Sequence, residues 1–165
     1  MLQTAVVSAR QAVGETLSHV NFSDYDTRLA AYAAVVDDEK RLLLTWWNGE
    51  GRGTPGWSMP GGGVEFEESL TEAVEREVLE ETGYLVKVGS PIATHSFTIA
   101  DGGRDGRPYK SLRVVFSATI IGGTLGITEV GGSTDFAGWV PLDEVESLES
   151  TADIVDVAVA AIRPR

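Results

Sequence analysis

Hydrophobic and polar positions along the chain form blocks that predict a mixed order of strands and helices. Residues 28–36 and 41–47 are apolar, strand-like runs, and the polar segment 37–40 joins them, so they are predicted to form a hairpin. Residues 48–63 are rich in glycine and contain proline. This composition predicts that the segment is mostly loop.

The clearest predicted helix covers residues 69–81. Ser69 is followed three positions later by Glu72, which is a capping-box signature, and Gly83 is a natural stop residue. These local signals predict both ends of the helix.

The second half of the chain continues the mixed order. Pro141 suits a first helical turn and predicts a short helix over 141–148, and apolar residues at helical spacing predict another over 151–162. Strand-like runs lie at residues 85–88, 92–99, 112–121 and 136–140.

The size and composition of the chain favour one folded domain. A chain of 165 residues with 42% hydrophobic and 23% charged residues is typical of a globular protein, which argues against a disordered or fibrous one. No internal repeat or linker divides it, so we predict a single domain over residues 1–165. Residues 1–27 are weakly patterned and are expected to form a partly ordered N-terminal arm.

Charge and residue usage narrow the classes of partner. The net charge of -12 disfavours nucleic-acid polymers, although a small phosphorylated ligand remains compatible if cations neutralise the carboxylates. The absence of cysteine excludes disulfides and thiolate sites. Neither a signal peptide nor an apolar stretch of about 18 to 20 residues is present, so we expect a cytoplasmic protein without a membrane partner.

The candidate chemistry lies in the predicted helix over residues 69–81. At about 100° per residue, Glu77, Glu80 and Glu81 continue the helix face that Leu70 and its apolar neighbours begin. Like charges three and four positions apart repel, and the helix dipole disfavours negative charge near a C-terminus. This face therefore needs positive charge nearby.

Two interpretations of this acidic face are open. Arg76 supplies a single positive charge, so Mg²⁺, or Mn²⁺ as a substitute, is predicted to meet the remaining demand through oxygen ligands. The alternative is an ordinary charged helix whose glutamates face water. The glycines just before the helix favour the first interpretation, because their backbone N–H groups can approach a bound anion closely.

Residues 62–84 also carry a motif with fixed spacing. Gly62 is followed after five residues by Glu68 and, after seven more, by Arg76-Glu77-Val78-Leu79-Glu80-Glu81-Thr82-Gly83-Tyr84. This pattern resembles the Nudix box, GX5EX7REUXEEXGU with U a bulky apolar residue, and every fixed position is present. Flanking segments extend the resemblance to about residues 28–145. Tyr84 replaces a more usual aliphatic residue, and Glu67 stands where many relatives have glycine.

The resemblance implies a fold and an activity. The fold is the α/β Nudix fold, an α/β/α sandwich around a mixed β-sheet. The activity is metal-dependent hydrolysis of a phosphoanhydride bond in a nucleoside diphosphate-linked small molecule. A homodimer is compatible with the family.

The resemblance also implies roles for individual residues. Glu77, Glu80 and Glu81 are expected to bind the metal, Arg76 to position these carboxylates, and Gly61 and Gly62 to shape the substrate-binding loop. The general base is left open among Glu81, Glu129 and Asp135.

Two further side chains are candidates for the site. Glu65 is a possible additional metal ligand, with a solvated loop carboxylate as the alternative. Trp46 is a possible stacking surface for a nucleobase, with core packing as the alternative.

Other functions with this motif are conceivable. A nucleotide-binding sensor module with little turnover would be expected to lose a box glutamate, and none is lost here. An isoprenoid diphosphate isomerase would normally need a nucleophilic cysteine. Neither the proline that accompanies ADP-ribose activity nor a coenzyme A signature is found, which favours a nucleoside triphosphate or an oxidised nucleotide as substrate.

Overall fold

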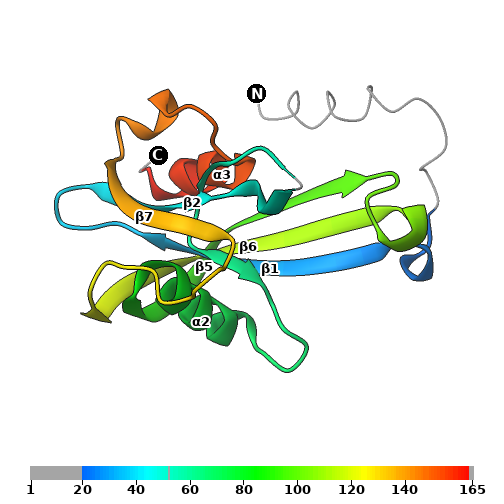
Figure 1. The fold of residues 1–165 in the computed structure, drawn as a ribbon, viewed down its shortest axis with the longest axis horizontal. Coiled ribbons are helices and arrows are strands. Elements are labelled where there is room, and N and C mark those ends of the chain that lie inside the picture. Colours follow the sequence, from blue (N-terminus) through cyan, green and yellow to red (C-terminus); the bar gives the residue numbers. More distant parts are fainter. Residues whose placement is uncertain (1–19, 52, 164–165) are drawn as a thin grey trace.

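The computed structural model describes residues 20–51 and 53–163, whose strands form two sheets (Figure 1). A four-stranded sheet has the order β4-β1-β6-β5, and a three-stranded sheet has the order β3-β2-β7. The strands are β1 (Asp26–Val35), β2 (Arg41–Trp47), β3 (Gly56–Ser58), β4 (Gly61–Gly63), β5 (Tyr84–Ile99), β6 (Tyr109–Gly123) and β7 (Thr134–Pro141).

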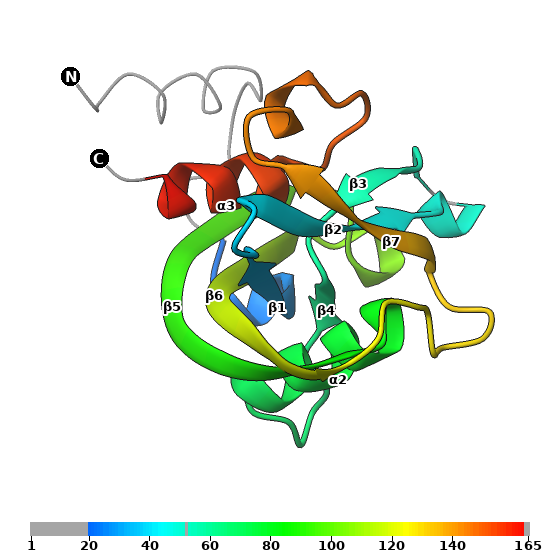
Figure 2. The same cartoon turned by 90° about the vertical axis from the view of Figure 1, so that its left-hand side faces the viewer.

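The four-stranded sheet is mixed, because β1 runs parallel to β6 while the other pairs in it are antiparallel. The helices α2 (Leu70–Thr82) and α3 (Asp153–Ile162) lie on opposite sides of the strands (Figure 2). This arrangement confirms the predicted α/β/α sandwich around a mixed sheet.

The predicted hairpin of residues 28–36 and 41–47 is wrong in its pairing. Both strands exist, but they belong to different sheets and share only the isolated antiparallel bridge between Val36 and Leu42. The reason is that β1 already pairs with β4 along one edge and with β6 along the other. On the edge away from β6, residues 30–32 of β1 are therefore occupied by β4 and are not paired with β2.

The glycine-rich segment 48–63 is not simply a loop. It contains β3, which pairs with β2, and β4, which pairs with β1. Glycine is a poor strand former, but pairing with a neighbouring strand overrides this local preference. The three glycines of β4 therefore form an edge strand beside β1, next to α2.

The helix α2 begins and ends where the local signals predict. The Ser69 side chain accepts from the backbone N–H of Glu72, the Glu72 carboxylate accepts from the backbone N–H of Ser69, and Gly83 closes the helix with a φ of 73°. The helix predicted over residues 151–162 is also present, as α3.

The short helix predicted over residues 141–148 is not formed. Pro141 is the last residue of β7, and only Val145–Ser147 form a 3-10 turn. The backbone N–H of Leu142 donates to the carbonyl of Lys40, so the chain there is still tied to the start of β2. The strand predicted over 136–140 is correspondingly longer at both ends.

The strands predicted over residues 85–88 and 92–99 are one continuous strand, β5. Its pairing with β6 shifts register between Val88 and Ala93, where Pro91 interrupts the regular ladder. Of the predicted N-terminal arm, residues 1–19 lie outside the described residues. The remainder includes a 3-10 turn at Phe22–Asp24 and the first residues of β1.

Two hydrophobic clusters hold the layers together. One joins alternate residues of β1, including Ala30 and Tyr32, to α3, and the other joins their neighbours, including Ala31, to α2. The period-two alternation of β1 therefore anchors a helix on each face of the sheet. Within the described part of the chain, no helix has the length and apolar character needed to cross a membrane.

Candidate active site

The carboxylate-bearing face of α2 packs against the glycines of β4. A Cβ atom added to Gly62 would overlap the Glu77 carboxylate, with its carboxyl carbon only 2.7 Å away. At Gly61 the backbone has a φ of 139°, and an added Cβ would lie 2.6 Å from the Cα atom of Tyr32. Both positions therefore need glycine for the close approach of α2, β4 and β1.

Arg76 connects most of this site. Its Nε and Nη2 atoms donate to the two oxygens of Glu68 at 2.6 and 3.0 Å. Its Nη1 atom lies 3.0 Å from Oε1 of Glu77 and 3.1 Å from Oε2 of Glu80, and Nη2 also donates to the Gly63 carbonyl at 3.1 Å. One guanidinium thus links the helix start, the acidic face and β4.

Glu81 is buried between β4 and β7. Its Oε2 atom accepts from the backbone N–H of Gly61 at 2.9 Å, and its Oε1 atom accepts from the hydroxyl of Thr134 at 2.6 Å. Burial raises the pKa of Glu81 to about 7, and the nearby charges of Glu77 and Glu129 act in the same direction. The two hydrogen bonds offset only part of this effect.

Glu77 is also withdrawn from solvent, with 16% of its side chain exposed. Burial raises its pKa, while the ion pair with Arg76 opposes the increase. An ordinary solvated helix would leave these glutamates in water, so the burial of Glu77 and Glu81 contradicts that alternative interpretation. The neighbouring Leu79 is 38% exposed, because it lies off this face of α2.

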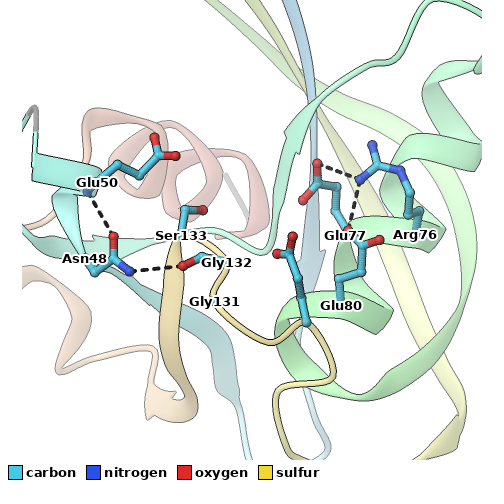
Figure 3. Close-up of a pocket in the computed structure, with 9 residues that line it drawn as sticks. Asn48, Glu50, Arg76, Glu77, Glu80, Gly131, Gly132 and Ser133 are labelled. Atoms are coloured by element: carbon cyan, nitrogen blue, oxygen red, sulfur yellow. Dashed lines mark hydrogen bonds and ion pairs between the residues drawn. The ribbon is translucent and has the colours of Figure 1, made fainter.

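A polar cavity of about 540 Å³ opens beside this face of α2. In Figure 3, Arg76, Glu77 and Glu80 face Asn48, Glu50 and Ser133 across it. The two walls come from α2 on one side and from the end of β2 and the segment before β7 on the other. The lining residues are Asn48, Glu50, Arg76, Glu77, Glu80, Glu129, Gly131, Gly132 and Ser133.

Besides the buried Glu81, three predicted side chains are not part of this lining. Glu65 is exposed, and its backbone N–H donates to Glu68. Asp135 is exposed and accepts from the Asn48 side chain at 3.1 Å. Trp46 stacks on Phe136 with ring centroids 5.8 Å apart. The structure therefore places all three outside the cavity.

Two residues that shape the site were not predicted. Thr134 holds Glu81, and Asn48 ties the end of β2 to the segment before β7 by donating to the Gly132 carbonyl at 3.2 Å. Thr134 precedes a predicted strand, and Asn48 follows one, so each position had only a weak local signal. Their roles depend on contacts between distant parts of the chain.

The donor set suits a hard divalent cation. Glu77, Glu80 and Glu129 offer oxygen ligands, whereas Arg76 is the one cationic side chain among the described residues that line the cavity. Within residues 20–51 and 53–163, no three acidic or histidine side chains are already gathered around a single point. Arg76 holds Glu77 and Glu80, so a bound ion would compete with its guanidinium for these carboxylates.

Comparison with known proteins agrees with this fold and motif. A family model described as the NUDIX domain matches residues 26–159. This chain belongs to the Nudix family. The match extends the predicted Nudix resemblance to the start of β1 and almost to the end of α3.

Two curated relatives are similar over part of their length. One is an ADP-ribose pyrophosphatase from Methanocaldococcus jannaschii, 36% identical over 97 residues, which are 59% of this chain and 53% of the relative. The other is a Bacillus subtilis protein whose name proposes 8-oxo-dGTP diphosphatase activity, 35% identical over 65 residues, 39% of this chain and 41% of the relative. The chain thus spans about half or less of these relatives.

Solved Nudix structures share the fold. A NUDIX hydrolase from Nitrosomonas europaea gives a TM-score of 0.67 at 24% identity, covering 82% of this chain and 88% of that one. A MutT NUDIX hydrolase from Burkholderia pseudomallei gives a TM-score of 0.68 at 24% identity, covering 84% and 99%.

Proposed function

We propose that this protein is a divalent-metal-dependent pyrophosphohydrolase that cleaves a phosphoanhydride bond in a nucleoside diphosphate-linked small molecule. The observation that carries the proposal is the set of carboxylates on one face of α2, which packs against the β4 glycines and in which Arg76 links Glu77 and Glu80. Family membership and the names of the two curated relatives support the same reaction class.

Glu77, Glu80 and Glu81 would hold Mg²⁺ or Mn²⁺, and Glu129, whose backbone N–H donates to the Glu80 carbonyl, lines the same cavity. Such an ion polarises phosphoryl oxygens and offsets the charge that develops on the leaving phosphate. Arg76 keeps Glu77 and Glu80 in place through its ion pairs. Preorganised charge of this kind lowers a barrier because no rearrangement is needed during the reaction.

Glu129 is the preferred proton acceptor among the three candidates. Its side chain lines the cavity. The Glu81 side chain does not line the cavity and accepts a hydrogen bond from Gly61, and the Asp135 side chain accepts one from Asn48. In the proposed step, water forms a bond to phosphorus and the bridging P–O bond breaks. The electron pair of that bond goes to the leaving phosphate, and the proton of the water goes to the Glu129 carboxylate.

The test is a product-release assay over a panel of nucleotides with and without Mg²⁺. ADP-ribose and 8-oxo-dGTP come first, because the curated relatives are named for these compounds. Dinucleoside polyphosphates and coenzyme A follow. We expect Mg²⁺-dependent turnover of at least one compound.

Two variants distinguish a catalytic role of Glu80 from a general effect of removing one negative charge from α2. Glu80→Gln is expected to lower kcat by at least about 100-fold with the fold intact. Glu75→Gln removes an exposed carboxylate from the same helix and is expected to leave kcat unchanged. Ligand binding by the wild type without turnover of any compound would favour the sensor module instead.

A further inference from the structure

Arg28 stands beside the glycine strand on the face of the sheet opposite α2. A Cβ atom added to Gly63 would lie 3.6 Å from the Nη2 atom of Arg28, so the guanidinium lies against the backbone of β4. It also contacts the hydroxyl of the buried Tyr32, and it experiences the charge of Glu77. Arg28 is therefore close to the proposed hydrolytic site while remaining exposed to solvent.

Arg28 differs from the other arginines of the described chain in its partners. Arg41, Arg76, Arg104, Arg107, Arg113 and Arg163 each form an ion pair with a carboxylate. For Arg28, residues 20–51 and 53–163 provide no carboxylate within 4.0 Å. Its guanidinium thus keeps donors that a ligand can use.

The proposed substrate needs such a group. A diphosphate brings negative charge next to Glu77, Glu80 and Glu129, and Arg76 is already engaged by Glu68, Glu77, Glu80 and the Gly63 carbonyl. Arg76 donates from one side of Gly63, and Arg28 lies against the other. A planar guanidinium suits bidentate hydrogen bonding to phosphate oxygens.

The neighbouring position on β6 carries a buried, unpaired hydroxyl. Ser111 is the cross-strand partner of Arg28, it is 1% exposed, and its hydroxyl has no hydrogen-bond partner within the described part of the chain. Buried polar groups in folded proteins are nearly always paired. Because Ser111 is buried, its hydroxyl does not reach a ligand at the surface, and the inference rests on the guanidinium of Arg28.

We propose that Arg28 is a substrate-binding residue whose guanidinium donates to the phosphoryl oxygens of the diphosphate from the side of β4 opposite Arg76. This inference rests on the proposed function. The substrate would then lie across β4, with its diphosphate between the carboxylates of α2 and Arg28.

Calorimetric titration with methylenediphosphonate in excess Mg²⁺ tests the proposal without turnover. This probe carries carbon in place of the bridging oxygen, so it cannot be hydrolysed as a phosphoanhydride, and it has no nucleobase. Arg28→Gln is expected to weaken its binding by about 10- to 100-fold, which is the range for a lost charged hydrogen bond. Arg28→Lys is expected to be intermediate, because it keeps the charge and loses the planar fork.

Arg163→Gln is the matched control, because it removes an equal charge from an arginine paired with Glu146. It is expected to bind like the wild type. With any hydrolysed nucleotide, Arg28→Gln should raise KM far more than it lowers kcat, and its melting temperature should match that of the wild type. A purely structural role would instead lower the melting temperature.

The outcomes separate this inference from the proposed function. If the wild type binds the probe through Arg28 but hydrolyses no nucleotide, the inference stands and the proposed function fails. If the wild type is active and Arg28→Gln binds the probe equally well, the inference fails alone. Absence of probe binding by the wild type would also overturn the role of Arg28.

Discussion

The buried carboxylate of Glu81 allows a quantitative test of the site's electrostatics. Glu81 is 7% exposed, and burial raises its pKa from 4.5 to about 7. Below the pKa that Glu81 has in the unfolded chain, its carboxyl group is protonated in both the folded and the unfolded state. Between about pH 4.5 and pH 7 the unfolded chain has released this proton while the folded protein still holds it, so the free energy of unfolding falls over this range.

The size of this loss follows from the pKa. Each pH unit between the two pKa values corresponds to about 1.4 kcal/mol. The full loss in unfolding free energy is therefore about 3 kcal/mol, most of which falls between pH 5 and pH 8.5. The measurement requires EDTA, because a bound cation would stabilise the charged form.

Glu81→Gln removes the charge but keeps the shape of the side chain. Its amide oxygen can accept from Gly61, and its amide nitrogen can donate to the Thr134 hydroxyl. Relative to the wild type, the variant should gain about 2 to 3 kcal/mol in unfolding free energy between pH 5 and pH 8.5. For a chain of this size, the gain corresponds to a melting-temperature difference of roughly 5 to 10 °C.

Urea unfolding at both pH values measures this difference directly. Glu75→Gln, an exposed substitution on the same helix, should show no such pH dependence. A constant difference between Glu81→Gln and the wild type at pH 5 and pH 8.5 would refute the reasoning. The variant should also lose Mg²⁺-dependent turnover. Glu81 would therefore lower the stability of the folded protein while being required for activity.

Four further predictions address other parts of the site. Gly62→Ala places a methyl group 2.7 Å from the Glu77 carboxyl carbon, so kcat/KM should fall by about 10- to 100-fold in steady-state assays. Ser69→Ala removes the cap of α2 and should reduce the unfolding free energy by about 1 kcal/mol, measured in urea, without changing kcat. The hydrogen bond from Arg76 lowers the pKa of Glu68 from 4.5 to about 2. The stabilisation by the ionised Glu68 carboxylate is therefore present above pH 4.5 and is lost towards pH 2. The melting temperature of Glu68→Gln should accordingly fall less on acidification than that of the wild type. Millimolar Mg²⁺ should raise the melting temperature of the wild type more than that of Glu80→Gln, and equal shifts would argue against Glu80 as a ligand.

Local sequence determined the parts of this protein that depend on neighbouring residues. Ser69, Glu72 and Gly83 set the ends of α2 because caps act within a single turn. The helical period likewise placed Glu77, Glu80 and Glu81 on one face with the apolar residues of α2. The acidic face of this helix was therefore predictable before its surroundings were known.

Tertiary structure decided which distant segments meet. Local patterns do not specify which strand edge a neighbour occupies, so the pairing of β1 with β4 and β6, and the strand formed by three glycines, could not be predicted. The same limit applied to the site, where Thr134 reaches Glu81 and Asp135 points to Asn48. In β7, successive side chains point to opposite faces of the sheet, so a one-residue difference in position decides which of them meets Glu81.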